Sequence, residues 1–337
     1  MCYYLGMSKT ILSGLKPTGR PHMGNYFGMM RQLINLQSEG QVFGIIVDYH
    51  ALNFIQNAGE MRDLTREIAI DYLALGFNTD KNILFKQSDV SEHTELAWIF
   101  DTITTVPYLK RAHAYKDAVA KGGEEDVSAG TFTYPMLMAA DILLYDTDIV
   151  PVGQDQKQHI EFARDTAEKF NRVFGETFKL PEAYIIKDVE TVPGIDGRKM
   201  SKSYNNTISL FAEDKEIEEK VMAIVTDSSG ERPENVYAIH KLLVGQNGST
   251  SFDNSQDKSL TIDKLEKVYQ ENKGQYKVLK EMLIEDLINF IRPMRERREE
   301  IAKDLDFVNK VLEEGKEKAR AVASRKMSEV KKAIGVN

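Results

Sequence analysis

One stretch decides the fold: residues 134–159, YPMLMAADILLYDTDIVPVGQDQKQH, which join a helical face, a short strand and a polar turn. Tyr134, Met138 and Asp141 recur at i, i+4 and i+7, so they project from one face of a helix. We expect this helix to begin at Thr133, because a proline is tolerated in a first helical turn. The face is either a ligand-binding wall or ordinary core in which Asp141 caps or pairs with a neighbour. In both cases the carboxylate needs donors, because an unpaired buried charge is costly.

A short strand and a polar turn follow this helix. Residues 148–152 (DIVPV) are mostly apolar, as expected of a buried parallel strand. Residues 153–156 (GQDQ) come directly after it, and helical periodicity resumes over 157–171. In open α/β sheets ligands bind at the carboxyl ends of the strands, and a turn that leads into a helix can bind sugar hydroxyls or phosphates. The turn is therefore a candidate binding site.

Strand-like and helix-like segments alternate up to about residue 205. Further strands are expected at residues 9–13, 42–48, 82–85 and 183–186, and helices at 26–37, 60–75 and 92–104. This order predicts an α/β fold with a parallel sheet. Residues 116–130 are rich in glycine and charge, so we expect a mobile surface loop there. After Ser203, helices are expected at 214–225, at 235–243 and from 262 to the end.

The composition excludes several classes of protein. The chain has 337 residues and a formal charge of −8, so any contact with nucleic acid must be local. Its single cysteine, Cys2, excludes an internal disulfide framework and a cysteine-built metal site, and it fits a cytoplasmic protein. No apolar run approaches the roughly 18 residues of a membrane span. Residues 1–6 precede a second methionine, Met7, and are either an upstream extension or a short tail.

Two short motifs indicate phosphate chemistry. Residues 22–25 (HMGN) precede a helix, where Gly24 lets a ligand approach backbone N–H groups and the His22 imidazole can hydrogen-bond a phosphate oxygen. By itself this tetrapeptide is weak, and a loop histidine beside a turn glycine is the alternative. Residues 199–203 (KMSKS) place two lysines three positions apart, with hydroxyls between and after them. Such a loop can surround a polyphosphate and spread positive charge over it, although most basic loops are solvated surface.

The two motifs resemble those of one enzyme family. Residues 199–203 match the KMSKS signature of class I aminoacyl-tRNA synthetases, and residues 22–25 resemble their HIGH signature. The segments YPMLMAADILLY and PVGQDQKQH further resemble bacterial-type tryptophanyl-tRNA synthetases, and the similarity runs from about Met7 to the C-terminus. The resemblance implies an α/β fold with a Rossmann-type parallel-sheet nucleotide-binding domain and a C-terminal all-helical domain, in a homodimer.

The resemblance also implies domain limits and a reaction. Residues 1–205 would form the Rossmann-type catalytic domain, 206–300 a helical anticodon-binding domain, and 301–337 a C-terminal helix packed back on the catalytic domain. The enzyme would activate L-tryptophan with ATP, giving tryptophanyl-adenylate and pyrophosphate, and then transfer tryptophan to the 3′ end of tRNA(Trp) with release of AMP. Mg2+ would be carried on the phosphates, because no carboxylate cluster has the spacing of a dedicated site.

Site roles follow from the same resemblance, residue by residue. Asp141 would accept the indole N–H of tryptophan. The other tryptophan-binding residues would be Tyr134, Met138, His50 and Gln156. The ATP-binding residues would be Lys16, Pro17, Thr18, Gly24, Asn25, Gly153, Gln154, Asp155, Val192, Lys199, Met200, Ser201, Lys202 and Ser203. The catalytic residues would be His22, Lys199 and Lys202, which would stabilise charge on the triphosphate and on the departing pyrophosphate.

Three positions depart from the family pattern. Lys16 stands where a glutamine is usual, Leu12 where phenylalanine is common, and His22 restores a histidine that many tryptophan enzymes lack. An ammonium at position 16 favours a carboxylate or an α-phosphate more than a neutral amide does.

Two rival functions stay open. A tyrosyl-tRNA synthetase would carry glutamine at the position of Met138, because a methionine cannot usefully bond a phenol. A non-aminoacylating paralogue that senses tryptophan or tRNA would have lost phosphate-handling residues, whereas both signatures are present.

The basic residues of 315–332 are either a solvated helical face or a local footprint for tRNA phosphates. The same alternatives hold for Arg292, Arg295, Arg297 and Arg298.

Overall fold

A five-stranded parallel sheet lies at the centre of the protein. The computed structural model describes residues 9–17, 19–152, 157–185, 192–226, 232–244 and 261–336. The strands are β1 (Lys9–Leu15), β2 (Gly40–Ile46), β3 (Ile83–Lys86), β4 (Ile149–Val152) and β5 (Glu182–Ile185). They are ordered β3-β2-β1-β4-β5, and all neighbours are parallel. After β1 the chain adds β2 and β3 on one side and then β4 and β5 on the other, so the strand order switches between β1 and β4. Doubly wound sheets bind ligands outside the carboxyl ends of strands at such a point.

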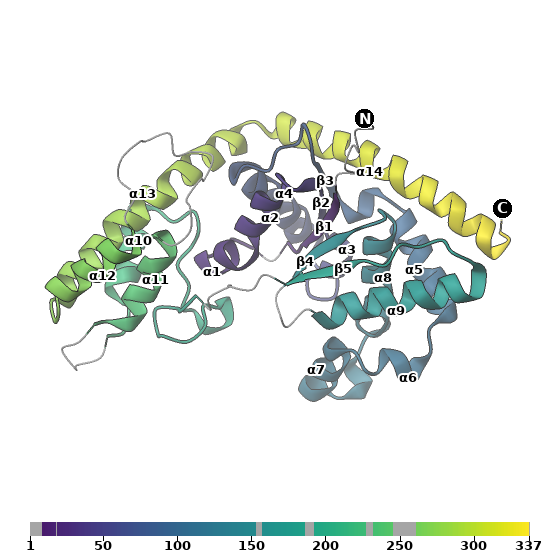
Figure 1. Ribbon diagram of the computed structural model, residues 1–337, viewed down its shortest axis with the longest axis horizontal. Coiled ribbons are helices and arrows are strands. Elements are labelled where there is room, and N and C mark those ends of the chain that lie inside the picture. Colours follow the sequence, from purple (N-terminus) through teal and green to yellow (C-terminus); the bar gives the residue numbers. More distant parts are fainter. Residues whose placement is uncertain are drawn as a thin grey trace, which may run out of the picture.

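Both faces of the sheet are covered. Ile11 and Leu15 of β1 belong to one apolar core, whereas Leu12 between them belongs to the other. Successive side chains of a strand point to opposite faces, so strands that are apolar at every position need helices on both sides. Figure 1 shows α2 and α4 on one side of the sheet, and α5, α8 and α9 on the other. The α/β class with a parallel sheet is confirmed.

The helices fall into two groups along the chain. Those of the sheet-containing part are α1 (Met23–Asn25), a π-helical turn (Tyr26–Met30), α2 (Arg31–Leu36), α3 (Asp48–Ala51), α4 (Ala58–Ala74), α5 (Glu92–Ile103), α6 (Val106–Leu109), α7 (His113–Gly122), α8 (Ala129–Leu143) and α9 (Lys157–Phe174). Those that follow are α10 (Asp214–Met222), α11 (Glu234–Val244), α12 (Ile262–Glu271), α13 (Tyr276–Lys303) and α14 (Leu305–Ile334). None of the described helices is long and apolar enough to cross a membrane.

The second group of helices packs directly on the sheet-containing part. The rings of Phe27 and Phe290, from the π-helical turn and α13, stack with centroids 5.8 Å apart. Figure 1 shows α13 and α14 following each other along one side of the molecule. At Gly315 of α14 an added Cβ would lie 1.9 Å from the Leu84 carbonyl oxygen, so only glycine allows this helix to lie against β3. The edge strand is thereby covered.

Two local predictions were wrong. The helix that carries Asp141 begins at Ala129 rather than Thr133, because Ser128 caps it by accepting the Thr131 N–H at 3.1 Å. Pro135 therefore lies inside the helix.

Residues 116–130 are also not a loop throughout, because α7 extends to Gly122 and a short 3-10 turn covers Glu124–Asp126. Alanine-rich sequence and the buried ring of Tyr115 stabilise α7, and Gly123 with a φ of 94° ends it.

Candidate active site

The two signature segments lie against each other. The Gly24 N–H points at the Met200 sulfur at 3.3 Å, and the Met23 N–H donates to the Ile208 carbonyl at 3.0 Å. An added Cβ at Gly24 would lie 2.9 Å from the His22 ring and 3.4 Å from Met200 Cβ, so glycine is needed for this approach. The HIGH-like and KMSKS segments, far apart in sequence, thus share one site.

His22 presents an uncharged imidazole to this site. Burial lowers its pKa to about 4, and the nearby Lys202 ammonium acts in the same direction. Its Nδ1 atom is buried and makes no hydrogen bond with the described residues. Asn25 steadies the segment, since its side-chain oxygen accepts the His22 backbone N–H at 3.0 Å. A neutral ring nitrogen without a partner is suited to hydrogen-bond a phosphate group.

A buried asparagine organises the KMSKS loop. The Asn206 side chain accepts the Ser201 N–H at 2.8 Å and donates to the Lys199 carbonyl at 3.1 Å. It also donates to the Asp196 carboxylate at 2.7 Å. Gly194 makes room for it, because a Cβ there would lie 2.2 Å from Asn206 Nδ2. We did not predict Asn206 from the sequence, although it lies only three positions after the motif.

Lys199 and Lys202 are both exposed, and Lys202 reaches toward the segment that follows β1. The Lys202 ammonium lies 3.6 Å from the place where a Cβ on Gly19 would stand. Desolvation lowers the pKa of Lys202, and the Asp71 carboxylate of α4 raises it. Asp71 in turn accepts a 2.6 Å hydrogen bond from Arg298 of α13. Positive charge is therefore brought close to the HIGH-like segment.

The other residues predicted to bind ATP are placed as follows. Lys16 follows β1, its ammonium lies 5.2 Å from the centre of the Phe54 ring, and desolvation lowers its pKa. Pro17 and Val192 are buried, and Ser203 is exposed. Thr18, Gly153, Gln154, Asp155 and Gln156 lie outside the described residues.

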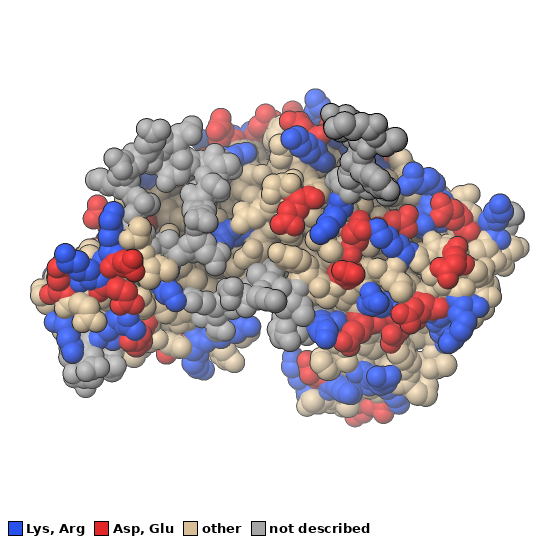
Figure 2. All heavy atoms as spheres, in the orientation of Figure 1, with Lys and Arg blue, Asp and Glu red and all other residues tan. Residues whose placement is uncertain are grey.

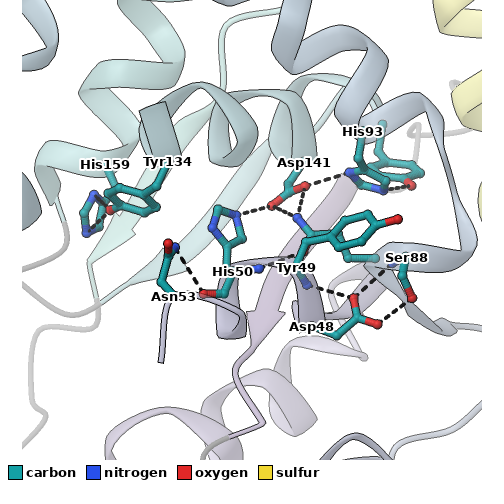
Figure 3. Close-up of polar contacts among 11 residues, drawn as sticks. Asp48, Tyr49, His50, Asn53, Ser88, His93, Tyr134, Asp141 and His159 are labelled. Atoms are coloured by element: carbon teal, nitrogen blue, oxygen red, sulfur yellow. Dashed lines mark hydrogen bonds and ion pairs between the residues drawn. The ribbon is translucent and has the colours of Figure 1, made fainter. Parts of the chain in front are cut away.

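A buried carboxylate on α8 is the centre of the second half of the site (Figure 3). The Gln87 amide donates to both oxygens of Asp141, at 2.8 and 2.9 Å. His93 Nδ1 lies 2.7 Å from Oδ1, and His50 Nε2 lies 3.0 Å from Oδ2. Burial raises the pKa of Asp141, but the hydrogen bonds with the two histidines outweigh it and bring the pKa to about 2. The carboxylate is therefore ionised and satisfied, as its place on this face predicted.

Tyr134 and Met138 share the same face of α8. The Tyr134 hydroxyl lies 2.6 Å from His159 Nδ1, and its ring meets the His50 ring edge-on at 5.6 Å. Figure 3 shows His50 between Tyr134 and Asp141. Met138 is half-buried and packs at the rim of the apolar core. The predicted face thus has an ionised end at Asp141 and an apolar part beside it.

Sequence reasoning missed several residues of this half. Gln87 directly follows β3, so the rule that ligands lie at the carboxyl ends of strands could have found it. His93 had no such signal, because its partners are 48 and 52 positions away, whereas Tyr145 and His159 lie within residues 134–159 but were given no role. Within the part of the chain that the structure describes, no group of three or more His, Cys, Asp or Glu side chains could hold a metal ion.

The two halves together suit a reaction driven by positioning and charge. One half offers lysines, backbone N–H groups and a neutral imidazole, which can hold and stabilise a polyphosphate. The other offers an ionised acceptor beside apolar side chains, which suits an aromatic ring with an N–H donor.

Comparison with known proteins agrees with this geometry. Residues 7–292 match the family of tRNA synthetases class I (W and Y). The tryptophan–tRNA ligase of Fusobacterium nucleatum is 45% identical over 97% of this chain and 98% of its own length, and that of Rhodopirellula baltica is 43% identical over 97% and 99%. The crystal structure of tryptophanyl-tRNA synthetase from Campylobacter jejuni, complexed with ADP and tryptophan, has a TM-score of 0.86 at 39% identity, covering 97% of this chain and 99% of that one. The chain therefore belongs to the class I tRNA synthetases for tryptophan and tyrosine.

Proposed function

We propose that this chain is a tryptophan–tRNA ligase. It activates L-tryptophan with ATP to tryptophanyl-adenylate and pyrophosphate, and then transfers tryptophan to the 3′ end of tRNA(Trp), releasing AMP. The observation that carries this proposal is the contact between the HIGH-like and KMSKS segments, Gly24 N–H to Met200 sulfur, in a chain that also holds a buried, ionised Asp141 on α8. The full-length similarity to tryptophan–tRNA ligases supports the choice of amino acid.

In the first step the tryptophan carboxylate attacks the α-phosphorus of ATP in line, so the enzyme needs no nucleophile of its own. Neutral His22 hydrogen-bonds the triphosphate, and Lys199 and Lys202 stabilise the charge that grows on the pyrophosphate as it departs. The ammonium of Lys16 adds charge near the carboxylate or the α-phosphate. Mg2+ is carried on the phosphates. In the second step a ribose hydroxyl at the tRNA end attacks the adenylate.

Specificity resides on the α8 face. Asp141 accepts the indole N–H, with Tyr134, Met138 and His50 around the ring. An N–H donor left without an acceptor would be costly in this buried setting, so the carboxylate favours tryptophan over phenylalanine. Met138 offers no useful partner to a phenol, which disfavours tyrosine.

tRNA binding is proposed for the helical part, with domain limits at about residues 205 and 300. Most of the candidate basic residues already pair with carboxylates: Lys316 with Glu313, Arg320 with Glu92, Lys326 with Asp146 and Glu329, Lys331 with Glu95, Arg292 and Arg295 with Asp214, and Arg298 with Asp71. Figure 2 likewise shows acidic and basic side chains interspersed on the face in view. We therefore propose that tRNA phosphates contact the exposed Lys318, Arg325 and Lys332 of α14. These three residues recur every seven positions and so lie along one face of the helix.

A homodimer is proposed through the side of the molecule formed by α5, α6 and α9. Trp98 of α5 is 71% exposed, and Val106 and Val173, from α6 and α9, are also exposed. Contiguous exposed apolar side chains mark surfaces where a partner binds, and we propose that these three belong to one such surface. Because charging of tRNA serves translation, we place the enzyme in the cytoplasm.

The deciding experiment is tRNA-free pyrophosphate exchange, run separately with tryptophan and tyrosine. We expect exchange to depend on tryptophan and to be far weaker with tyrosine. Equal exchange with both amino acids would assign the chain to another member of the family. Absence of exchange with either, in protein that binds tRNA, would favour the non-aminoacylating paralogue.

A further inference from the structure

A chain of buried side chains lies behind Asp141, on the side away from Tyr134 (Figure 3). The Tyr145 hydroxyl lies 2.8 Å from His93 Nε2, and His93 Nδ1 lies 2.7 Å from Asp141 Oδ1. The Gln87 amide completes the support by donating to both carboxylate oxygens. His93 and Gln87 are fully buried and Tyr145 nearly so, which means that no solvent replaces any of these bonds.

The proton positions in this chain follow from burial. Burial and the Asp141 charge raise the pKa of Tyr145 well above its ordinary value, so its hydroxyl stays protonated and can donate to His93 Nε2. With Nε2 accepting from Tyr145, the ring hydrogen lies on Nδ1, and this N–H donates to Asp141. Tyr145 thus selects the tautomer that makes His93 a donor to the carboxylate.

The contacts of Asp141 are not equivalent. Gln87 and His93 approach from the core, whereas His50 lies between the carboxylate and the Tyr134 ring, on the side proposed for tryptophan. A carboxylate has about four acceptor positions, and these side chains already make four contacts with Asp141. An indole N–H must therefore replace one of them, and the His50 contact is the one on its side.

We propose that His93, oriented by Tyr145, and Gln87 are positioning residues for amino-acid selection: they hold Asp141 ionised and turned toward the tryptophan ring without touching it. This role depends on the tryptophan site proposed above. It goes beyond that site because it assigns specificity to residues that the substrate does not contact.

The test compares three substitutions by pyrophosphate exchange with tryptophan and with phenylalanine. His93→Phe keeps a ring but removes both hydrogen bonds, and we expect kcat/KM for tryptophan to fall roughly ten- to a hundredfold, the scale of one hydrogen bond to a charged group. His93→Asn restores a donor toward Asp141 and should recover part of the loss. Tyr145→Phe keeps the ring that packs 4.8 Å from Phe43 and should cost roughly two- to tenfold. The KM for ATP should stay unchanged in all three.

The pH profile separates positioning from a structural role. Without the His93 N–H the pKa of Asp141 rises, so kcat/KM for tryptophan should begin to fall at a higher pH on the acid side in His93→Phe than in the wild type. His50, which also faces Asp141, is present in every variant, and Glu92 acts on Tyr145. The difference between the two profiles therefore reports the His93 contact.

Tyr269→Phe is the matched control, because the Tyr269 hydroxyl lies 3.1 Å from His240 Nδ1 in the helical part, far from the site. It should leave the tryptophan preference and the pH profile unchanged. If His93→Phe does not fold, Tyr145→Phe decides. If kcat/KM falls equally for tryptophan and phenylalanine, and the acid side of the pH profile does not shift, the contacts among Tyr145, His93 and Asp141 have only a structural role. A wild type without tryptophan-dependent exchange would instead overturn the proposed function.

Discussion

Two parts of the molecule contain the same sequence of contacts, tyrosine hydroxyl to imidazole to carboxylate, in different settings. In the catalytic half Tyr145 contacts His93, which contacts Asp141. In the helical half Tyr269 contacts His240, and His240 Nε2 lies 2.6 Å from Asp286. The Asp141 side chain is 5% exposed and the Asp286 side chain 42%. Water can complete the hydrogen bonding of Asp286, whereas only protein groups or a substrate can do so for Asp141.

Lys202 and Lys280 likewise place the same chemical group in two different settings. Burial lowers the pKa of both Lys202, in the signature loop, and Lys280, on α13. Lys280 donates to the Met222 and Ile224 carbonyls at 2.9 and 2.7 Å, which secures the end of α10. Lys202 instead extends toward Gly19 beside the HIGH-like segment. The ammonium of Lys280 thus supports the fold, whereas that of Lys202 lies near the segment proposed to bind the phosphates.

The largest effect is expected from Lys202→Ala. Charge on the leaving pyrophosphate grows during the reaction, so the rate of adenylate formation should fall by roughly two or more powers of ten, with a smaller change in ATP affinity. Lys280→Met should leave that rate nearly intact but lower the free energy of unfolding by about 1–3 kcal/mol, because it leaves buried carbonyls without a donor. Single-turnover kinetics measure the rate of adenylate formation, and denaturant unfolding measures the free energy of unfolding, in both variants. A rate loss no larger than the affinity loss would assign Lys202 to ground-state binding.

The next effect is expected from Asp141→Ala. Loss of a charged acceptor should lower kcat/KM for tryptophan by a factor on the order of a hundred, and should lower that for phenylalanine, which has no ring donor, far less. Asp286→Ala should change neither, since its carboxylate faces water. Pyrophosphate exchange with tryptophan and with phenylalanine, measured for Asp141→Ala and Asp286→Ala, tests this prediction. Equal losses with tryptophan and phenylalanine in Asp141→Ala would mean that the carboxylate is structural.

Short-range pattern was enough to predict the parallel sheet, the α8 face and both signature segments. The period of 3.6 placed Tyr134, Met138 and Asp141 together, and the structure keeps them on one face of α8. His50, which contacts Asp141, was among the predicted residues, and Gln87 could have been found from its place after β3, but His93, 48 positions from Asp141, could not be predicted from local pattern. Nothing local in the sequence encodes the contact between His93 and Asp141.

Local prediction failed where composition conflicted with a cap or with packing. The glycines of 116–130 suggested a loop, but α7 ends only at Gly122, and Lys110 and Tyr115 both bond the Glu124 carboxylate that follows. The start of α8 was placed too late because Pro135 was taken as the sign of a helix start, whereas Ser128 is the cap. All site roles that carry over from the family stay predictions, and Thr18 and residues 153–156 also lie outside the described residues.

The third prediction concerns stability in acid. The pKa of Asp141 is held at about 2, below its ordinary value, so its contribution to stability is present above about pH 4 and is lost as the pH falls toward 2. The shift corresponds to on the order of 2 kcal/mol. Asp141→Asn should therefore show a shallower loss of unfolding free energy across this window than the wild type, and Asp286→Asn should follow the wild type more closely. Urea unfolding at several pH values measures the slopes. Parallel slopes in all three proteins would contradict the account of Asp141.

The smallest effect is expected where two methionines are compared. Met138 is half-buried on the α8 face, and Met294 is buried on α13 among apolar side chains. An amide at position 138 would lie beside the tryptophan ring without a partner, so Met138→Gln should lower kcat/KM for tryptophan about tenfold. The same amide can bond a phenol, so exchange with tyrosine should rise from its wild-type level. Met294→Gln introduces the same group into the helical half and should lower stability while leaving the tryptophan-to-tyrosine ratio unchanged. Pyrophosphate exchange with both amino acids, alongside thermal unfolding, compares the two. If the ratio changes equally in both variants, or in neither, Met138 does not line the amino-acid site and its assignment fails.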